Sequence, residues 1–144
     1  MELKAVLYTS TEINENDKHL LNRYFSIMHP EGLDGKALTL DLLQGDSISE
    51  LEKISNVDVT LMLKLFESLD FPQKSRYKRI EEIIKHTRSK WIVTSFATKT
   101  ISGKGMQFKQ RRWFDLMLQR MGLSFSKIEK PNETFYIIKN SKNE

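Results

Sequence analysis

Residues 90–112 read KWIVTSFATKTISGKGMQFKQRR, and the stretch changes character halfway. Its first part, residues 91–96, is a short apolar run typical of a buried strand. Its second part is a glycine-containing loop with five basic residues and no acid: Lys99, Lys104, Lys109, Arg111 and Arg112. Since α/β proteins bind ligands beyond the carboxyl ends of their strands, a strand that runs into a cationic loop predicts a polyanion-binding surface. Nucleic acid is the first partner to consider.

The charge is unevenly distributed along the 144 residues, whose net charge is +4. Residues 74–120 carry thirteen Lys and Arg against three acids, a net of +10, and the remainder carries ten against sixteen, a net of −6. The segregation has two interpretations, a pair of solvated helix faces or a surface for an anionic partner. Its scale favours the anionic partner.

Composition excludes several other classes of protein and site. There is no cysteine, so disulfides and thiolate metal sites are excluded, and His19, His29 and His86 lack metal-ligand spacing. No apolar run approaches the roughly 20 residues of a membrane helix, and the first residues do not resemble a signal peptide. We expect a cytoplasmic protein with no membrane contact and no metal.

The periodicity of apolar residues alternates between strand and helix spacing, in the order β-α-β-α-β-α-β-α-β-β. This order predicts an α/β fold with a mostly parallel sheet covered by helices on both faces, and a closing hairpin that adds one antiparallel edge strand. We expect a single domain over residues 1–140 and a tail at 141–144. The expected strands are residues 4–9, 36–43, 57–66, 91–96, 125–129 and 134–139, and the expected helices are 14–28, 48–54, 75–87 and 107–121.

Polar side chains stand at three of the strand ends. Glu12 is suited to accept hydrogen bonds from ribose hydroxyls, or it caps a helix or is solvated. Asp41 is suited to accept from the amine of a base, or it forms a turn. Lys64 lies between leucines, where an unpaired charge is costly inside a sheet, so we expect it at the strand's mouth or reaching solvent. No nucleophile–base pair, paired-carboxylate centre or glycine-rich phosphate loop occurs.

Taken in order, five stretches resemble the back part of the S-adenosylmethionine-dependent methyltransferases. More narrowly, they resemble the aminoglycoside-resistance family that methylates N7 of a guanine in small-subunit ribosomal RNA. The resemblance covers residues 3–139, and its most specific part is SF-x-x-K-x-I-S-G-K-G-M. The stretches are YTSTEIN, LDLLQGD, VDVTLMLKLFESLD, WIVTSFATKTISGKGM and ETFYIIK.

The resemblance implies a Rossmann-like fold, S-adenosylmethionine as cofactor, and ribosomal RNA or the small ribosomal subunit as partner. No general base is required, because the N7 atom of guanine carries no proton. Carried over by position, the implied cofactor residues are Glu12, Ile13, Asp41 and Leu42. The implied target-pocket residues are Leu63, Lys64, Ser95 and Phe96. The implied RNA contacts are Lys99, Lys104, Lys109, Arg111 and Arg112.

The chain also departs from the family's pattern. The family has a further strand and a G-x-G-x-x loop before the acidic strand, and here the chain begins at the acidic strand. Ala97 stands where the family usually has proline. We therefore expect an N-terminally truncated relative that lacks the usual first strand. Its function is either that of an RNA methyltransferase, partial or degenerate, or that of a non-catalytic RNA-binding module. We also expect the neighbours of the missing strand to pair with each other or with another chain, as in a homodimer.

Overall fold

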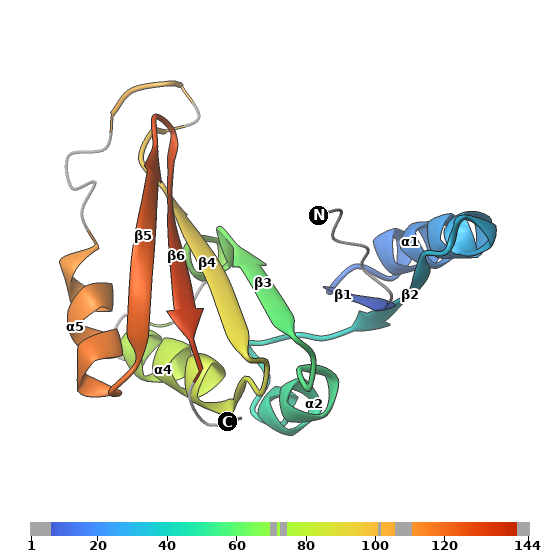
Figure 1. Cartoon of the computed structure of the whole chain (residues 1–144), viewed down its shortest axis with the longest axis horizontal. Helices are drawn as coiled ribbons and strands as arrows, with labels where there is room; N and C mark the ends of the chain where they lie inside the picture. Colours follow the sequence, from blue (N-terminus) through green and yellow to red (C-terminus); the bar gives the residue numbers. More distant parts are fainter. Residues whose placement is uncertain (1–6, 70–71, 73–74, 101, 106–110, 141–144) are drawn as a thin grey trace. The chain divides into compact units, whose positions relative to one another are not determined.

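The computed structural model describes residues 7–69, 72, 75–100, 102–105 and 111–140. The chain divides into two compact units, Met1–Glu50 and Leu51–Glu144. The first contains a two-stranded sheet, β1-β2, and the second a four-stranded sheet, β3-β4-β6-β5, whose strands are labelled in Figure 1. The predicted α/β class is confirmed, but the strands form two sheets instead of the single one expected, because no described strand links β1 to β3.

The first unit is a β-α-β arrangement. β1 (Leu7–Glu12) runs parallel to β2 (Asp34–Thr39), and the two are joined by α1 (Glu15–Met28) and the short 3-10 helix η1 (His29–Glu31). Gly32 ends η1 at a φ of 84°, a left-handed conformation in which glycine has no side-chain clash. β1 ends at Glu12, beyond the predicted end at residue 9. β2 begins at Asp34 and ends at Thr39, both earlier than the predicted bounds of 36 and 43.

Helix α1 packs closely on β2 and protects its edge. Phe25 is buried against Gly35, where a Cβ atom would lie 2.3 Å from the phenyl ring, so the site requires glycine. The Asn22 side chain accepts from the Ala37 N–H at 2.8 Å and donates to the Ala37 carbonyl at 3.0 Å. It thereby takes the place of a neighbouring strand at this point of β2.

The second unit has a mixed sheet. β3 (Val59–Leu63) runs parallel to β4 (Trp91–Ala97), β6 (Glu133–Lys139) is antiparallel to β4, and β5 (Ser124–Lys130) is antiparallel to β6. The predicted closing hairpin is confirmed, but its antiparallel strand is not the edge. The returning strand β6 lies inside the sheet, between β4 and β5, because its alternate residues Thr134, Tyr136 and Ile138 are buried whereas β5 is mostly exposed.

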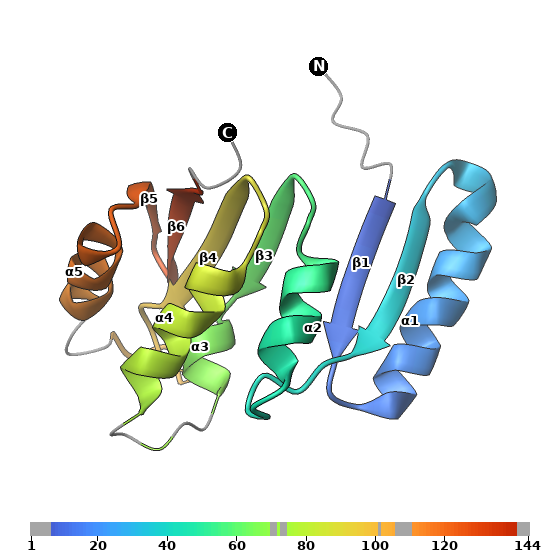
Figure 2. The same cartoon turned by 90° about the horizontal axis from the view of Figure 1, so that it is seen from below.

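Four helices accompany this sheet among the residues that the structure describes. They are α2 (Ser47–Ile54), which begins in the first unit and ends in the second, α3 (Leu65–Ser68), α4 (Arg76–His86) and α5 (Arg112–Arg120). The short helix α3 corrects the expectation of a strand up to residue 66, and the start expected for the last helix, residues 107–110, lies outside the described residues. Figure 2 shows α3 and α4 on the same side of β3 and β4.

The core of the second unit lies between its sheet and helices α3–α5. Phe96 and Tyr136 on the strands lie near Phe114 on α5, at ring-centroid distances of 5.1 Å and 4.9 Å, and Ile80, Ile83 and Ile84 of α4 are also buried. The other face of β3 differs. Val59, Leu61 and Leu63 are 47%, 53% and 51% exposed. The expectation that both faces are covered therefore fails for β3, where apolar side chains face outward.

Candidate functional site

Glu12 and Asp41 lie at the same end of the first unit's sheet. β1 and β2 are parallel, with Glu12 opposite Thr39, and the Leu40 N–H donates to the Glu12 carbonyl at 3.1 Å. Asp41 follows Leu40 directly. Because the carboxyl ends of parallel strands meet at one edge, the two carboxylates predicted for a cofactor occupy the edge at which such sheets bind ligands.

The carboxylate of Glu12 is half-buried and has no hydrogen bond or ion pair with the described part of the chain. The cap of α1 is Asn14, whose Oδ1 accepts from the N–H groups of Asn16 at 2.8 Å and Asp17 at 3.4 Å. The capping role that the sequence left open for Glu12 thus belongs to Asn14. The oxygens of Glu12 remain available as acceptors for a ligand.

Asp41 has the turn-forming role that its sequence left open. Its Oδ1 accepts from the Leu43 N–H at 2.9 Å and its Oδ2 from Gln44 Nε2 at 3.2 Å. These bonds fix the carboxylate, and each oxygen retains a lone pair. Of the apolar residues predicted beside the carboxylates, Ile13 is 66% exposed and Leu42 is buried.

A third carboxylate, Glu15, lies at this end and was not predicted. Lys18 forms an ion pair with Glu15, and the Thr39 hydroxyl donates a hydrogen bond to it. The contact with Lys18, and to a lesser extent that with Thr39, holds the pKa of Glu15 below its usual value. Its position in the first turn of α1, after a parallel strand, is the sequence signal that would have identified it.

In the second unit, Lys64, Ser95 and Glu133 form one hydrogen-bonded cluster. Ser95 is fully buried, and its Oγ accepts from the Lys64 N–H at 3.0 Å and donates to Glu133 Oε1 at 2.5 Å. Lys64 Nζ lies 3.6 Å from Glu133 Oε2. The predicted residues Lys64 and Ser95 therefore meet at the carboxyl ends of β3 and β4, and Glu133, at the start of β6, joins them without having been predicted.

Lys64 lies at the strand's mouth, as predicted, with its side chain 53% exposed. Its φ is 52°, the only positive φ of a non-glycine residue in the part of the chain that the structure describes. Such a conformation is uncommon outside glycine and clusters at functional sites. The turn it makes carries the chain from Leu63 in β3 directly into α3.

Phe96 lies apart from this cluster. Because side chains alternate along a strand, Ser95 and Phe96 point to opposite faces of β4. Phe96 is buried on the helix-covered face, and the Arg111 guanidinium lies 5.5 Å from its ring centroid. The four residues expected to line one target pocket are thus divided. Leu63, Lys64 and Ser95 lie together, and Phe96 belongs to the aromatic core.

The cationic loop after β4 begins as a small hairpin. Lys99 pairs with Gly105, the Thr100 N–H donates to the Lys104 carbonyl at 2.8 Å, and Gly103 turns at a φ of 78°. Lys99 and Lys104 are exposed on it. The predicted contact Lys109 lies outside the described residues.

The two arginines after this loop differ in environment. Arg111 forms an ion pair with Glu67, donates to the Ala97 carbonyl at 3.3 Å, and has a side chain only 15% exposed. Arg112, the first residue of α5, is exposed. Of this predicted pair, Arg112 faces solvent and Arg111 is tied to α3 and β4.

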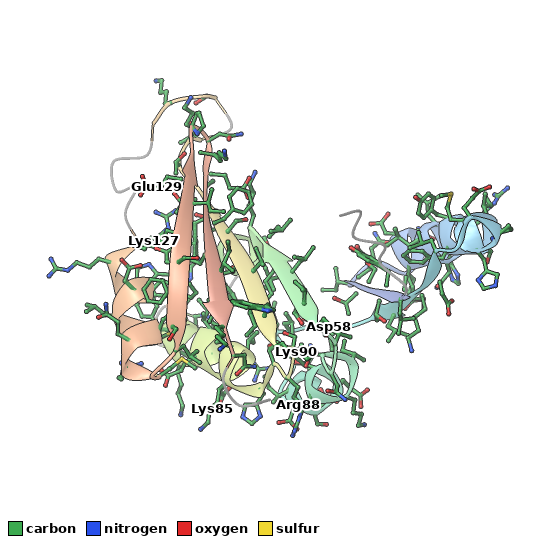
Figure 3. The ribbon with its side chains drawn as sticks, in the orientation of Figure 1. Asp58, Lys85, Arg88, Lys90, Lys127 and Glu129 are labelled. Atoms are coloured by element: carbon green, nitrogen blue, oxygen red, sulfur yellow. The ribbon has the colours of Figure 1, made fainter. Side chains whose placement is uncertain are left out.

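Ion pairs neutralise part of the positive segment near the amino ends of β3 and β4. Lys90 Nζ lies 2.7 Å from Asp58 Oδ1, and the two residues lie beside one another in Figure 3. This hydrogen bond lowers the pKa of Asp58 and raises the pKa of Lys90. Glu52 pairs with both His86 and Arg88. These cations stabilise the fold, whereas Lys99, Lys104 and Arg112 have no acidic partner among the described residues.

Within the described ranges, no group of three or more His, Asp or Glu side chains is placed to hold a metal ion. None of the described helices has the length and apolar character needed to cross a membrane.

Comparison with known proteins identifies the fold. No family model and no curated protein matches the chain. Among solved structures, the 16S rRNA methylase ArmA superimposes with a TM-score of 0.64 at 22% identity over 97% of this chain and 65% of its own. The methyltransferase domain of bacterial CtHen1 has a TM-score of 0.60 at 12% identity, over 92% of this chain and 77% of its own.

A third structure, magnesium protoporphyrin IX methyltransferase (ChlM) from Synechocystis PCC 6803 with bound S-adenosylmethionine, has a TM-score of 0.60 at 12% identity. It is matched over 93% of this chain and 59% of its own. The chain thus spans less than two thirds of the length of ArmA and ChlM. At these identities the likeness concerns architecture, and the chain has the fold of the S-adenosylmethionine-dependent methyltransferases.

Proposed function

We propose that this chain is part of an S-adenosylmethionine-dependent RNA methyltransferase that modifies N7 of a guanine in small-subunit ribosomal RNA. The observation that carries the proposal is the placement of Glu12 and Asp41 at one carboxyl edge of parallel strands. It is supported by the cationic hairpin after β4 and by the likeness to ArmA over 97% of the chain.

The first unit fits the nucleoside part of the cofactor. The carboxylate of Glu12 has unused acceptors for the two ribose hydroxyls, and Asp41 is held rigidly by its turn with lone pairs left for an amine. Ile13 is 66% exposed beside Glu12 and offers an apolar surface for the adenine ring. The role of these side chains is to bind and orient.

The second unit contributes positioning rather than acid–base chemistry. The bound cofactor supplies an activated methyl group, and the accepting nitrogen of guanine has no proton to lose. The Ser95 hydroxyl, bonded to both the Lys64 N–H and Glu133, fixes the strand ends, and its full burial keeps it from reaching a substrate as a nucleophile. Correct placement of the base is sufficient to bring the reacting atoms together.

Methyl transfer to RNA tests the proposal. Purified small ribosomal subunits incubated with the chain and labelled S-adenosylmethionine should acquire label at a guanine that becomes sensitive to cleavage chemistry specific for N7 methylation. The Asp41→Asn variant should incorporate less label, and Glu31→Gln, an exposed acid before β2, is the matched control. Absence of label with intact subunits and with naked RNA overturns the catalytic proposal.

A non-catalytic RNA-binding module is the second candidate. The exposed cations Lys99, Lys104 and Arg112 require no cofactor to bind phosphate. For this candidate, RNA binding persists and neither labelling nor cofactor binding is detected.

We also propose that a second copy of the chain pairs with β3. This strand is hydrogen-bonded along β4 only, and no described strand lies on its other edge. Its outward-facing Val59, Leu61 and Leu63 are about half exposed. Open edges with apolar side chains are templates for strand addition.

A further inference from the structure

A pocket of about 250 Å³ opens in the second unit, on the helix-covered side of the sheet. One wall consists of aromatic rings. Tyr77 on α4 and Trp113 on α5 have centroids 4.7 Å apart, and Phe96 on β4 meets Trp113 edge-on at 5.9 Å. Tyr77 is 53% exposed, which leaves much of its ring to solvent at the rim.

Polar side chains held by hydrogen bonds also line the pocket. Arg111 is held by Glu67 and the Ala97 carbonyl, while Glu67 also accepts from the Ala97 N–H at 2.9 Å. Arg76 donates to the Phe66 carbonyl at 3.0 Å. A guanidinium has five N–H donors, and this is the one bond that Arg76 makes to the described residues, so donors remain for a ligand in the pocket.

Aromatic rings together with an arginine that has unused N–H donors favour a flat ligand with hydrogen-bond acceptors, such as a nucleic-acid base. Unpaired bases stack on aromatic side chains and on guanidinium planes, and an arginine recognises the acceptor edge of a purine. The volume lies just below the ~300 Å³ at which pockets for drug-sized molecules begin. The pocket therefore has the size for a single base.

The surroundings favour a base that belongs to a nucleic acid. Lys78 and Arg112, each next to one of the pocket's aromatic residues, are exposed and have no acidic partner in the described part of the chain. Phosphates on either side of a stacked base would find these cations. Since the acid of the wall, Glu67, is already paired with Arg111, it does not repel an approaching phosphate strongly.

We infer that this pocket binds an unpaired base of the RNA at a position separate from the base that is methylated. The two positions lie on opposite faces of β4. Phe96 lines the pocket, whereas the adjacent side chain, Ser95, points to the other face and belongs to the cluster with Lys64 and Glu133. The inference rests on the proposed RNA substrate and adds a second recognition point to it.

Trp113 is a built-in reporter for the test. The chain has two tryptophans, so Trp91→Phe leaves Trp113 alone. Titration of this variant with a purine-rich single-stranded oligoribonucleotide should quench its fluorescence to saturation. Tyr77→Ala should weaken the binding by about 10-fold or more, the loss expected for one stacked base, with little change in the salt dependence.

Tyr24→Ala, a similarly exposed tyrosine of the first unit, is the matched control and should bind as the parent does. Circular dichroism of Tyr77→Ala verifies its fold. RNA binding without quenching of Trp113 fluorescence, or equal affinities of the Tyr77 and Tyr24 variants, would contradict the inference that the pocket binds a base. The proposal that RNA is the substrate would still stand. Absence of any RNA binding by the parent chain overturns both.

Discussion

At the scale of single residues, Ser95 is the connection on which the second unit's site depends. Its buried hydroxyl is the acceptor for the Lys64 N–H and the donor to Glu133. The left-handed turn at Lys64 is an unfavourable backbone conformation, and a specific hydrogen bond at that residue helps to maintain it.

The Ser95→Ala variant should lose stability because it leaves the part-buried Lys64 N–H and a part-buried oxygen of Glu133 without their partner. We expect a loss of about 1–3 kcal/mol in the free energy of unfolding, measured by urea denaturation. Ser126→Ala, at an exposed position of β5, should change it little. Equal stability of the two variants would show that the cluster does not hold the strand ends.

Tyr136 gives a prediction at alkaline pH. Burial, and then its hydrogen bond to Asp115 at 2.8 Å, raise the pKa of Tyr136 above its ordinary value. The unfolded chain releases this proton near pH ~10 and the folded chain retains it, so stability falls as pH rises above that value. The melting temperature of the parent should fall more steeply between pH 9 and 11 than that of Tyr136→Phe. Parallel curves would contradict this.

The same residues show how far sequence reasoning reaches. Lys64 could be placed from its strand end alone, because an unpaired charge between leucines is costly inside a sheet, whereas Ser95 was implied by the resemblance. Glu133 could not, since only the pairing of β4 with β6 brings it next to Ser95. The resemblance groups Phe96 with Ser95, whereas the alternation of side chains along a strand places the two on opposite faces of β4. Arg111 was read as an exposed cation because its partner, Glu67, is distant in sequence.

At the scale of elements, most strands and helices follow from apolar periodicity, and the differences arise where tertiary pairing decides. α4 and α5 have buried side chains at spacings of three and four, and their cores were predictable. The interior place of β6 was not, because a hairpin's sequence does not say which of its strands meets the sheet. Neither was α3, whose Leu65 and Phe66 continue an apolar run.

The hairpin after β4 is the element that should contact phosphates. Replacing Lys99 and Lys104 together by alanine removes two exposed cations, so the slope of log K against log salt should become shallower by about 1.4–1.8. Lys36→Ala, an exposed lysine of β2, is the control and should leave the slope unchanged. Filter binding at several salt concentrations measures it, and an unaltered slope in the double variant would exclude the hairpin from the RNA interface.

At the scale of the whole molecule, the edge of β3 with which no described strand pairs predicts self-association. Light scattering should find a dimer or larger species at micromolar concentration. Leu61→Lys should shift it to monomer by placing a charge on the outward face of β3. A parent chain that is monomeric at high concentration and melts cooperatively would rule out pairing with a second copy.

The likeness to ArmA covers nearly all of this chain but 65% of that protein. Glu12 and Asp41 lie at the carboxyl edge of β1 and β2, where we propose that the cofactor binds, and the strand-end pattern of the sequence predicted that they lie at this edge. What the sequence could not predict is whether these side chains suffice, because affinity depends on every contact a ligand makes.

Calorimetric titration with S-adenosylhomocysteine, the demethylated product, tests the central claim most directly. We expect saturable binding of one molecule per chain, with an affinity weakened about 10- to 100-fold by Glu12→Gln, which removes a charged acceptor, and unaffected by Glu31→Gln. A heat of dilution alone up to millimolar ligand, with the chain folded by circular dichroism, would contradict it.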